Sequence, residues 1–314
     1  MWACASWTQP MGLTTRPEIA VRKCTLGKRN EESEQMRNKR KPELLGNDCE
    51  IYLADCFDVL TELPAESVDM IFADPPYNLS NDGFTCHAGR AVSVNKGEWD
   101  RSRGIEKDFE FHKEWVSACR RVLKPNGTIW ISGTYHSIYA CGFALQVVGY
   151  HILNDICWFK PNASPNLSCR YFTASHETLM WARKSKKAKH VFNYDVMKNG
   201  AFAGDILKAP GKQMRSVWAI TTPRKEEKRY GKHPTQKPEE LLKRVILAST
   251  NEGDLVLDPF LGSGTTGVVA IRYERRFIGI EKEQQFYELA RKRLRDELGS
   301  KRSSLFKGVV HGKA

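Results

Sequence analysis

The segment VDMIFADPPY, residues 68–77, places a run of apolar side chains directly before an acid, two prolines and a tyrosine. The apolar run predicts a buried strand, so Asp74 stands at the strand's carboxyl end, where ligands bind in open α/β sheets. Pro75 and Pro76 fix the backbone and remove two N–H donors, while their carbonyl oxygens stay free to accept hydrogen bonds. An acid beside a rigid carbonyl suits an exocyclic amino group, and Tyr77 offers a ring that stacks on the base carrying it. The alternative for these four residues alone is a surface turn.

A second segment, DLVLDPFLGSGTT over residues 254–266, has the order strand, glycine-rich turn and helix. Glycines let the backbone approach a ligand closely, and this order is typical of a nucleotide-cofactor loop. The turn matches neither G-x-G-x-x-G nor the P-loop, and no Lys follows to hold phosphates, so ATP is disfavoured. Residues 276–281 predict another strand, which ends in Glu281, an acid placed to take a pair of ribose hydroxyls.

The two motifs together resemble those of a known family. Asp-Pro-Pro-Tyr at 74–77 with Phe-Leu-Gly-Ser-Gly-Thr-Thr at 260–266 looks like the amino methyltransferases, which methylate N6 of adenine or N4 of cytosine in DNA. The order of the motifs, with His-Pro-Thr-Gln-Lys-Pro at 233–238 just before the cofactor loop, is similar to the β group of that family. Segments 133–139 and 160–183 look more narrowly like the DpnA-type enzymes, the second adenine methylases of GATC restriction systems. The cell-cycle adenine methylases that read GANTC are similar but less close.

The resemblance implies the chemistry of the target base. Asp74 and the Pro75 carbonyl would accept the amino hydrogens, within a backbone held rigid by Pro76, and Tyr77 would stack on the base. The nitrogen lone pair would then attack the sulfonium methyl in line, with no covalent enzyme intermediate, so catalysis would rest on positioning and electrostatics. The base must first leave the helix, at a cost of roughly a few kcal/mol. Asp in the first position favours adenine over cytosine.

The resemblance also implies S-adenosylmethionine as the cofactor and assigns residues to it. Asp258 would face its amino group, Glu281 its ribose hydroxyls, and Asp55, at the end of a strand predicted over 50–55, its adenine amino group. Asp74 would border the same site. The remaining residues would contact the methionine part: Phe260, Gly262, Ser263, Gly264, Thr265 and Thr266, with Thr235, Gln236 and Lys237 reaching toward the carboxylate.

Alternating strands and helices predict an α/β protein with a doubly wound, mostly parallel sheet. The resemblance implies the S-adenosylmethionine-dependent methyltransferase fold, with seven strands, one of them antiparallel near an edge. The catalytic strand and the cofactor strand would then be neighbours in space. Besides the strands already named, strands are predicted over 128–132, 152–159 and 177–181, and helices over 106–123, 138–148, 238–248, 265–273 and 284–298.

Composition and motif positions divide the chain into segments. The predicted segments are a basic, flexible N-terminal extension over 1–44, in which Met36 is an alternative start; a catalytic half over 45–185 with a mobile loop at 80–104; a target-recognition insert over 186–232; a cofactor-binding half over 233–298; and a basic tail over 299–314. In the insert, cations would hold phosphates while polar and aromatic groups read the bases. Trp99, Trp218 or Tyr230 would stack on bases. The alternative for the insert is a plain surface excursion.

The chain has 314 residues, a formal net charge of +12, eight Trp and ten Tyr, which suits a polyanion such as DNA, duplex or single-stranded. We find no stretch as long as a membrane span and no apolar run that suits a signal peptide, and we expect a cytoplasmic protein. Nine cysteines without C-x-x-C indicate reduced thiols and no metal site. No Pro-Cys pair occurs, which argues against C5-cytosine methylation. A homodimer is compatible with all of this.

The function that the resemblance implies is N6-adenine methylation of a short DNA site, GATC, which protects DNA from a restriction nuclease. Four alternatives stay open: an N4-cytosine DNA methyltransferase, a GANTC-type adenine methyltransferase, an RNA adenine methyltransferase, and a catalytically dead DNA-binding module. RNA enzymes with similar motifs carry Trp in place of Tyr77. Both motifs are intact, which argues against a dead module.

Overall fold

The structure, a computed structural model, describes residues 41–77, 84–87, 90–93, 100–202, 208–209 and 211–311. These residues belong to one compact unit, Lys39–Ala314. Nearly all of the predicted N-terminal extension and about half of the predicted loop at 80–104 lie outside the described residues. Inside that loop, the strands β4 (Phe84–His87) and β5 (Arg90–Ser93) form a small antiparallel pair.

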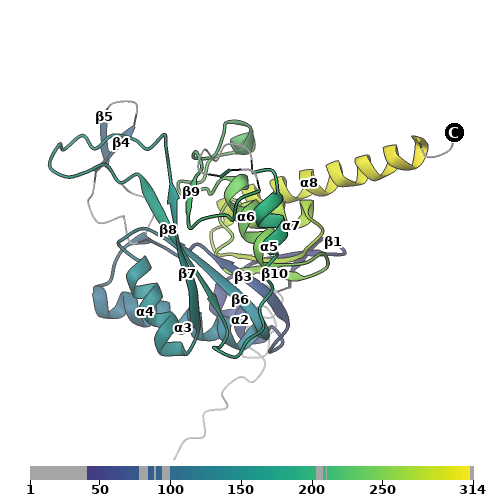
Figure 1. The fold of residues 1–314 in the computed structure, drawn as a ribbon, viewed down its shortest axis with the longest axis horizontal. Helices are drawn as coiled ribbons and strands as arrows, with labels where there is room; N and C mark the ends of the chain where they lie inside the picture. Colours follow the sequence, from purple (N-terminus) through teal and green to yellow (C-terminus); the bar gives the residue numbers. More distant parts are fainter. Residues whose placement is uncertain are drawn as a thin grey trace, which may run out of the picture. The chain divides into compact units, whose positions relative to one another are not determined.

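A single large sheet carries the fold (Figure 1). In the described part of the chain it has nine strands, which from one edge to the other are β1 (Glu43–Gly46), β2 (Cys49–Leu53), β11 (Arg276–Glu281), β10 (Leu255–Asp258), β3 (Val68–Ala73), β6 (Leu123–Gly133), β8 (His176–Arg183), β7 (His151–Phe159) and β9 (Val217–Ala219). The five strands from β2 to β6 are parallel, and β8 is antiparallel to both of its neighbours. The predicted mostly parallel α/β sheet is therefore confirmed.

Helices cover both faces of this sheet (Figure 1). The helices α2 (Cys56–Glu62), α3 (Ile105–Val122) and α4 (Ile138–Val148) pack on one face, and α5 (Tyr194–Asn199), α6 (Glu239–Ser249), α7 (Thr265–Arg272) and α8 (Gln284–His311) on the other. β3 shows why both faces are covered: Met70 and Phe72 join the core under α6–α8, while Ile71 and Ala73 join the core under α2–α4. Side chains alternate between the faces of a strand, and burying each large apolar side chain stabilises the fold by roughly 1.5–3 kcal/mol.

The catalytic strand and the cofactor strand are neighbours, as predicted. β3 pairs in parallel with β10, with Met70 opposite Val256 and Ile71 opposite Leu257. Parallel strands have their carboxyl ends at the same edge of a sheet, so Asp74 and Asp258 come to the same edge although they lie far apart in the sequence.

The sheet has two strands more than the seven predicted. β1 forms a tight antiparallel hairpin with β2, since Gly46 pairs with Cys49 across a two-residue turn, and β9 pairs with β7 at the other edge. Both are too short to give a periodic signal. β6 also begins earlier than predicted, because Leu123 already pairs with Val68 before an irregularity.

At the C-terminal end, the prediction of a basic tail over 299–314 is corrected by the structure. The helix α8 runs on to His311 instead of ending near Leu298. The segment that follows Leu298 contains no proline, and its two glycines within the helix, Gly299 and Gly308, are isolated ones, which a helical pattern tolerates.

The predicted target-recognition insert over 186–232 contains α5, β9 and the short 3-10 helix η2 (Glu226–Lys228). Trp218 is only 4% exposed and its ring packs near Trp130, so the prediction that Trp218 stacks on bases is wrong. The indole N–H donates to the carbonyl of Arg215 at 2.8 Å, which satisfies its polar atom inside the core. Tyr230 stays partly exposed, and Trp99 lies outside the described residues.

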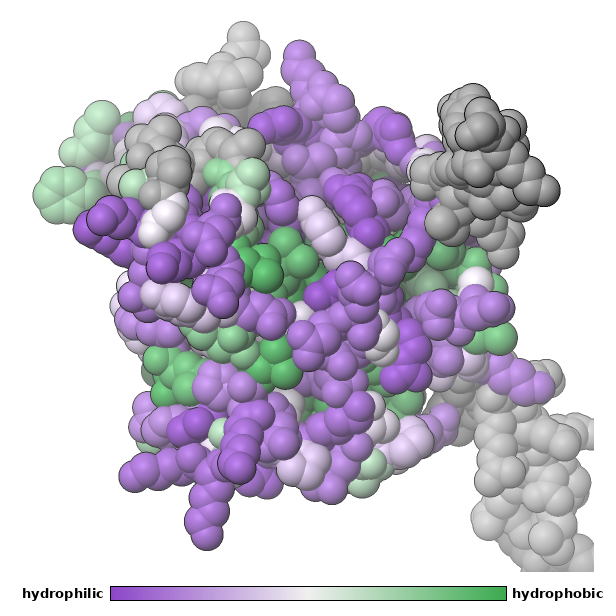
Figure 2. Space-filling view, turned by 45° about the vertical axis from the view of Figure 1, so that its right-hand side comes forward, coloured by the Kyte–Doolittle hydropathy of each residue, from purple (hydrophilic) through white to green (hydrophobic). Residues whose placement is uncertain are grey.

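Hydrophilic side chains dominate the face seen in Figure 2, with apolar side chains showing in patches between them. In the described residues, no helix is both long and apolar enough to cross a membrane.

Candidate active site

A cavity of about 740 Å³ opens at the carboxyl ends of four neighbouring strands, β2, β11, β10 and β3. Asp55, Asp74, Asp258 and Glu281 lie at or just beyond these strand ends and all line the cavity. The other predicted residues that line it are Pro75, Pro76, Tyr77, Thr235, Gln236, Lys237, Phe260, Gly262, Ser263, Thr265 and Thr266. The fold thus gathers residues from both halves of the chain around one space.

Gly264 does not line the cavity. It lies at the N-cap of α7 with φ of +77°, and a Cβ there would lie 2.9 Å from the Cβ of Ala290 in α8. The glycine is required for the turn and for close packing of two helices rather than for the ligand.

Asp74 is held from both carboxylate oxygens. The Nζ of Lys237 lies 2.6 Å from Oδ2, and the hydroxyl of Tyr77 donates to Oδ1. The backbone N–H of Tyr77 donates to Oδ1 of Asp100 at 2.8 Å, which holds the turn after β3. Burial raises the pKa of Asp74, and the charge of Lys237 acts in the opposite direction. The two contacts therefore hold the carboxyl group of Asp74 in a fixed orientation.

Tyr77 is a donor within a polar network. Its hydroxyl lies 3.0 Å from Oγ of Ser132 and 3.2 Å from Oε2 of Glu177, and its side chain is 3% exposed. Burial raises the pKa of the phenol well above its ordinary value, so the hydroxyl stays protonated. Sequence reasoning missed Glu177 and Ser132, because they belong to β8 and β6 and only the sheet brings them to Asp74.

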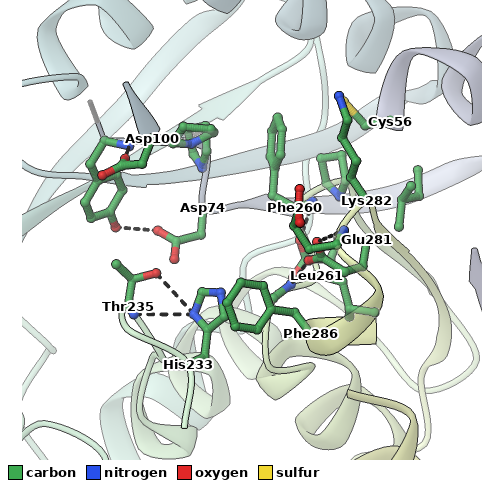
Figure 3. A pocket seen from close by; sticks show the side chains of 18 of the residues that line it. Cys56, Asp74, Asp100, His233, Thr235, Phe260, Leu261, Glu281, Lys282 and Phe286 are labelled. Carbon is green, nitrogen blue, oxygen red and sulfur yellow. Dashed lines mark hydrogen bonds between the residues drawn. The ribbon is translucent and has the colours of Figure 1, made fainter. Parts of the chain in front are cut away.

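The cavity carries two further carboxylates, Asp258 and Glu281, of which Glu281 lies across from Asp74 in Figure 3. Glu281 accepts hydrogen bonds from the backbone N–H groups of Gly262 and Glu283, both at 2.8 Å. Asp258 accepts from the hydroxyl of Thr266 at 2.6 Å and from the N–H of Phe260 at 3.0 Å. Burial raises the pKa of both acids to about 7. Each acid keeps lone pairs for a ligand, because a carboxylate offers about four acceptor positions.

Asp55 lies at the N-cap of α2, where it accepts from the N–H of Phe57 at 3.1 Å. It also pairs with Lys282 at 2.9 Å, a residue that sequence reasoning did not single out. Lys282 and Cys56 both line the cavity beside Glu281 (Figure 3).

The segment between η2 and α6 closes the cavity from below in Figure 3. The ring of His233 packs against Phe286 at 4.2 Å and its Nδ1 lies 3.3 Å from both N and Oγ1 of Thr235. The side-chain amide of Gln236 donates to the carbonyl of Glu227 at 2.8 Å. Thr235 and Gln236 contact residues of their own segment or of η2. Lys237 differs from them, because its side chain reaches across the cavity to Asp74.

The described residues contain no group of three or more His, Cys, Asp or Glu side chains that could hold a metal ion. The described cysteines at positions 49, 56, 119, 141, 157 and 169 are free thiols.

A doubly wound sheet with a glycine-rich turn and an acid-ended neighbouring strand, opening beside Asp-Pro-Pro-Tyr, defines the class of nucleoside-cofactor methyltransferases. The match to the family described as DNA methylase, N6_N4_Mtase, spans residues 68–292. The chain belongs to this family of DNA methylases, whose methyl donor is S-adenosylmethionine.

Two curated relatives illustrate the likeness. The chain is 54% identical over 258 residues to Type II methyltransferase M2.DpnII of Streptococcus pneumoniae, covering 82% of this chain and 93% of the relative. It is 50% identical over 243 residues to Type II methyltransferase M2.MboI of Moraxella bovis, covering 77% and 86%.

Solved structures agree. The M1.HpyAVI–SAM complex has a TM-score of 0.58 at 30% identity, covering 78% of this chain and 98% of that one. The PvuII DNA methyltransferase (cytosine-N4-specific) has a TM-score of 0.62 at 20% identity, covering 81% and 89%, which is a likeness of fold.

The turn at Gly262 generates a testable prediction for the cofactor. Gly262 has φ of +52°, and a Cβ there would lie 3.3 Å from the ring of His233 inside the cavity. Gly262→Val should therefore weaken binding of S-adenosylmethionine about tenfold or more, measured by calorimetry. Gly253→Val is the matched control, since it introduces the same backbone strain at φ of +80° with nothing nearby and away from the cavity. An unchanged dissociation constant for Gly262→Val would mean that the turn is structural only.

Proposed function

We propose that the protein transfers a methyl group from S-adenosylmethionine to N6 of adenine in DNA, within GATC. The observation that carries the proposal is the single cavity shared by the Asp74 carboxylate and the glycine-rich turn at 258–266. The relatives M2.DpnII and M2.MboI support it, because the sequence resembles the second methylases of GATC restriction systems.

Asp74 supplies the chemistry at the target nitrogen. The N6 lone pair is delocalised into the adenine ring, so the amino group is a poor nucleophile until acceptors draw its hydrogens. As nitrogen attacks the methyl carbon, the N–C bond forms, the C–S bond breaks and positive charge develops on nitrogen. A buried carboxylate stabilises that charge more in the transition state than in the ground state. The sulfur keeps the electron pair of the broken C–S bond and leaves as a neutral thioether, S-adenosylhomocysteine, and the nitrogen loses its extra proton to water.

The other face of the cavity suits the cofactor. Glu281, held by two backbone N–H groups, has oxygens left to accept from the ribose hydroxyls, and Asp258 has one for the methionine amino group. Asp55 lies near the predicted place of the adenine amino group. Phe260, Ser263, Thr265 and Thr266 surround the methionine part.

The DNA side of the proposal rests on charge and on exposed rings. The net charge of +12 favours a polyanion. With Trp218 buried, the exposed aromatic side chains of Tyr135, Tyr139, Tyr171 and Phe172 offer stacking surfaces for unpaired bases. Action on single-stranded DNA belongs to the proposal for this reason, since an unpaired target also lowers the cost of flipping the base. The insert at 186–232 keeps the proposed role of holding phosphates. A cytoplasmic location and a homodimer complete the proposal, and light scattering tests the latter.

Asp74→Ala should abolish methyl transfer, by a factor of about 100–1,000 or more, because it removes the acceptor at the reacting nitrogen. Radiolabelled methyl transfer to DNA with saturating cofactor measures this, and thermal unfolding checks that the fold is intact. Asp74→Asn keeps the shape of the side chain and should lose nearly as much. Near-normal turnover in both variants would sink the assignment.

Cofactor binding should depend on pH through Glu281. Burial raises the pKa of Glu281 to about 7, so the carboxylate is present above that pH and is protonated below it. The dissociation constant of S-adenosylmethionine should therefore rise about tenfold between pH 8 and pH 6, as the acceptor for the ribose is lost. Glu281→Gln should bind weakly at both values with a smaller slope; Asp258, whose pKa is also raised to about 7, accounts for the slope that remains. A full wild-type slope in Glu281→Gln would refute the role of this acid.

The target prediction is checked with oligonucleotides that carry GATC, GANTC or neither, as duplexes and as single strands, at stated salt. We expect N6-methyladenine in GATC, with methylation of single strands as well. Preferential methylation of GANTC would refute the site and keep the enzyme class, product at cytosine N4 would refute the base, and equal methylation of an RNA oligonucleotide would favour the RNA alternative.

A further inference from the structure

Glu177 lies in the middle of the polar network behind Asp74, on the antiparallel strand β8. We propose that Glu177 is a positioning residue for methyl transfer, which anchors Lys237 beside Oδ2 of Asp74 and borders the Tyr77 hydroxyl that donates to Oδ1. The sequence predicted that Lys237 reaches the carboxylate of the cofactor. On this proposal it serves the catalytic carboxylate of Asp74 instead. The inference rests on the proposed function.

The ammonium group of Lys237 is fully committed in this arrangement. Its Nζ lies 2.6 Å from Oδ2 of Asp74, 3.1 Å from the carbonyl of Thr235 and 3.6 Å from Oε2 of Glu177. The first two contacts are hydrogen bonds and the third is a longer ion pair, and together they hold the ammonium beside Asp74. The side chain is only 5% exposed, so water does not replace any of them.

Tyr77 connects the same two acids from the other side. Its hydroxyl contacts Oδ1 of Asp74, while Oε2 of Glu177 lies 3.2 Å away and Oγ of Ser132 3.0 Å away. Its ring also lies under the Nζ of Lys237, at 5.0 Å from the ring centre. Asp74 is therefore held at Oδ1 by the phenol of Tyr77 and at Oδ2 by the ammonium of Lys237. Both of those groups also lie near Oε2 of Glu177.

The charges of this cluster balance. Glu177 has a second cation, Lys160, with Nζ at 2.8 Å from Oε1, so two carboxylates face two ammonium groups. Burial alone would raise the pKa of Glu177, but Lys237 and Lys160 outweigh burial and hold it at about 2. Glu177 is thus a permanent anion. Buried charges persist only when they are paired in this way.

The pH dependence of kcat should reveal this role, on its acid limb, where kcat falls as the pH is lowered. The groups that act on Asp74 are Lys237 before α6, Glu177 on β8, Tyr77 after β3 and Asp258 on β10. The negative charge of Glu177 raises the pKa of Asp74, and the positive charge of Lys237 lowers it. Removing Glu177 should therefore move the limb to lower pH, and removing Lys237 should move it to higher pH.

The test compares Glu177→Gln and Lys237→Met on a GATC oligonucleotide, with kcat measured against pH and cofactor binding measured by calorimetry. We expect kcat to fall about tenfold or more in each variant, the two limbs to shift in opposite directions, and the dissociation constant of S-adenosylmethionine to change less than about threefold. Glu177→Asp restores the charge and should return the limb toward its wild-type position. Asp69→Asn is the matched control, because it removes a part-buried carboxylate, paired with Lys124, at the other end of β3.

Unchanged kcat and an unshifted limb in Glu177→Gln would overturn the inference, as would limbs that shift in the same direction or a large loss of cofactor binding in Lys237→Met. If Glu177→Gln does not fold, Lys160→Met takes its place: Glu177 then draws Lys237 away from Asp74, and the limb should move to higher pH. An unshifted limb in Lys160→Met would overturn the inference as well. A wild-type protein that methylates no amino group would refute the proposed function itself, which separates the two failures.

Discussion

The parallel pairing of β3 with β10 is the constraint on which the rest of the structure depends. It places Met70 beside Val256 and so brings the turn after Phe72 and Ala73 next to the glycine-rich turn after Asp258. A parallel neighbour requires a long crossover connection, and here nearly the whole chain between the two motifs serves as that connection. A methyl acceptor and a methyl donor need to meet at one point, and the pairing of two strands supplies it.

The cavity divides its charges by task. The acids on the cofactor side, Asp258 and Glu281, have backbone N–H and hydroxyl groups as hydrogen-bond donors, with no lysine or arginine among those donors in the described part of the chain, and burial raises their pKa values to about 7. Asp74 has the ammonium of Lys237 instead, and Glu177 behind it has two. Neutral donors leave oxygens of an acid open to a charged or hydroxylated ligand, whereas the ammonium of Lys237 fixes the orientation of Asp74 and opposes the rise in its pKa that burial causes. Acidic side chains therefore have different roles on the two sides: ligand binding on the cofactor side, and a fixed acceptor at the target nitrogen on the side of Asp74.

For the aromatic residues, the local sequence pattern and the tertiary packing give different answers about which side chains are exposed. Trp218 and Phe202 lie in a basic, irregular segment, a composition that suits contact with DNA, yet both are buried. Arg244, itself buried in α6, lies over both rings, at 5.4 Å from Trp218 and 5.2 Å from Phe202. Large exposed rings lie elsewhere, among them Tyr171 and Phe172 between β7 and β8. Composition predicts which residue types are present, but burial depends on the neighbours that the fold brings to them.

The strand-end acids, the glycine turn and the alternation of strands and helices were readable in the chain itself, because each depends on neighbours within a few residues: an apolar run before Asp74, a positive φ that only glycine adopts freely at Gly262, and a helical period in α3. The edge strands β1 and β9 and the partners of Asp74 were decided by tertiary structure alone. Glu177 lies 103 positions after Asp74 and Lys237 163 positions after it. No periodicity in the sequence links such residues. Only the order of the strands in the sheet brings the Glu177 carboxylate, the Lys237 ammonium and the Tyr77 phenol together around Asp74.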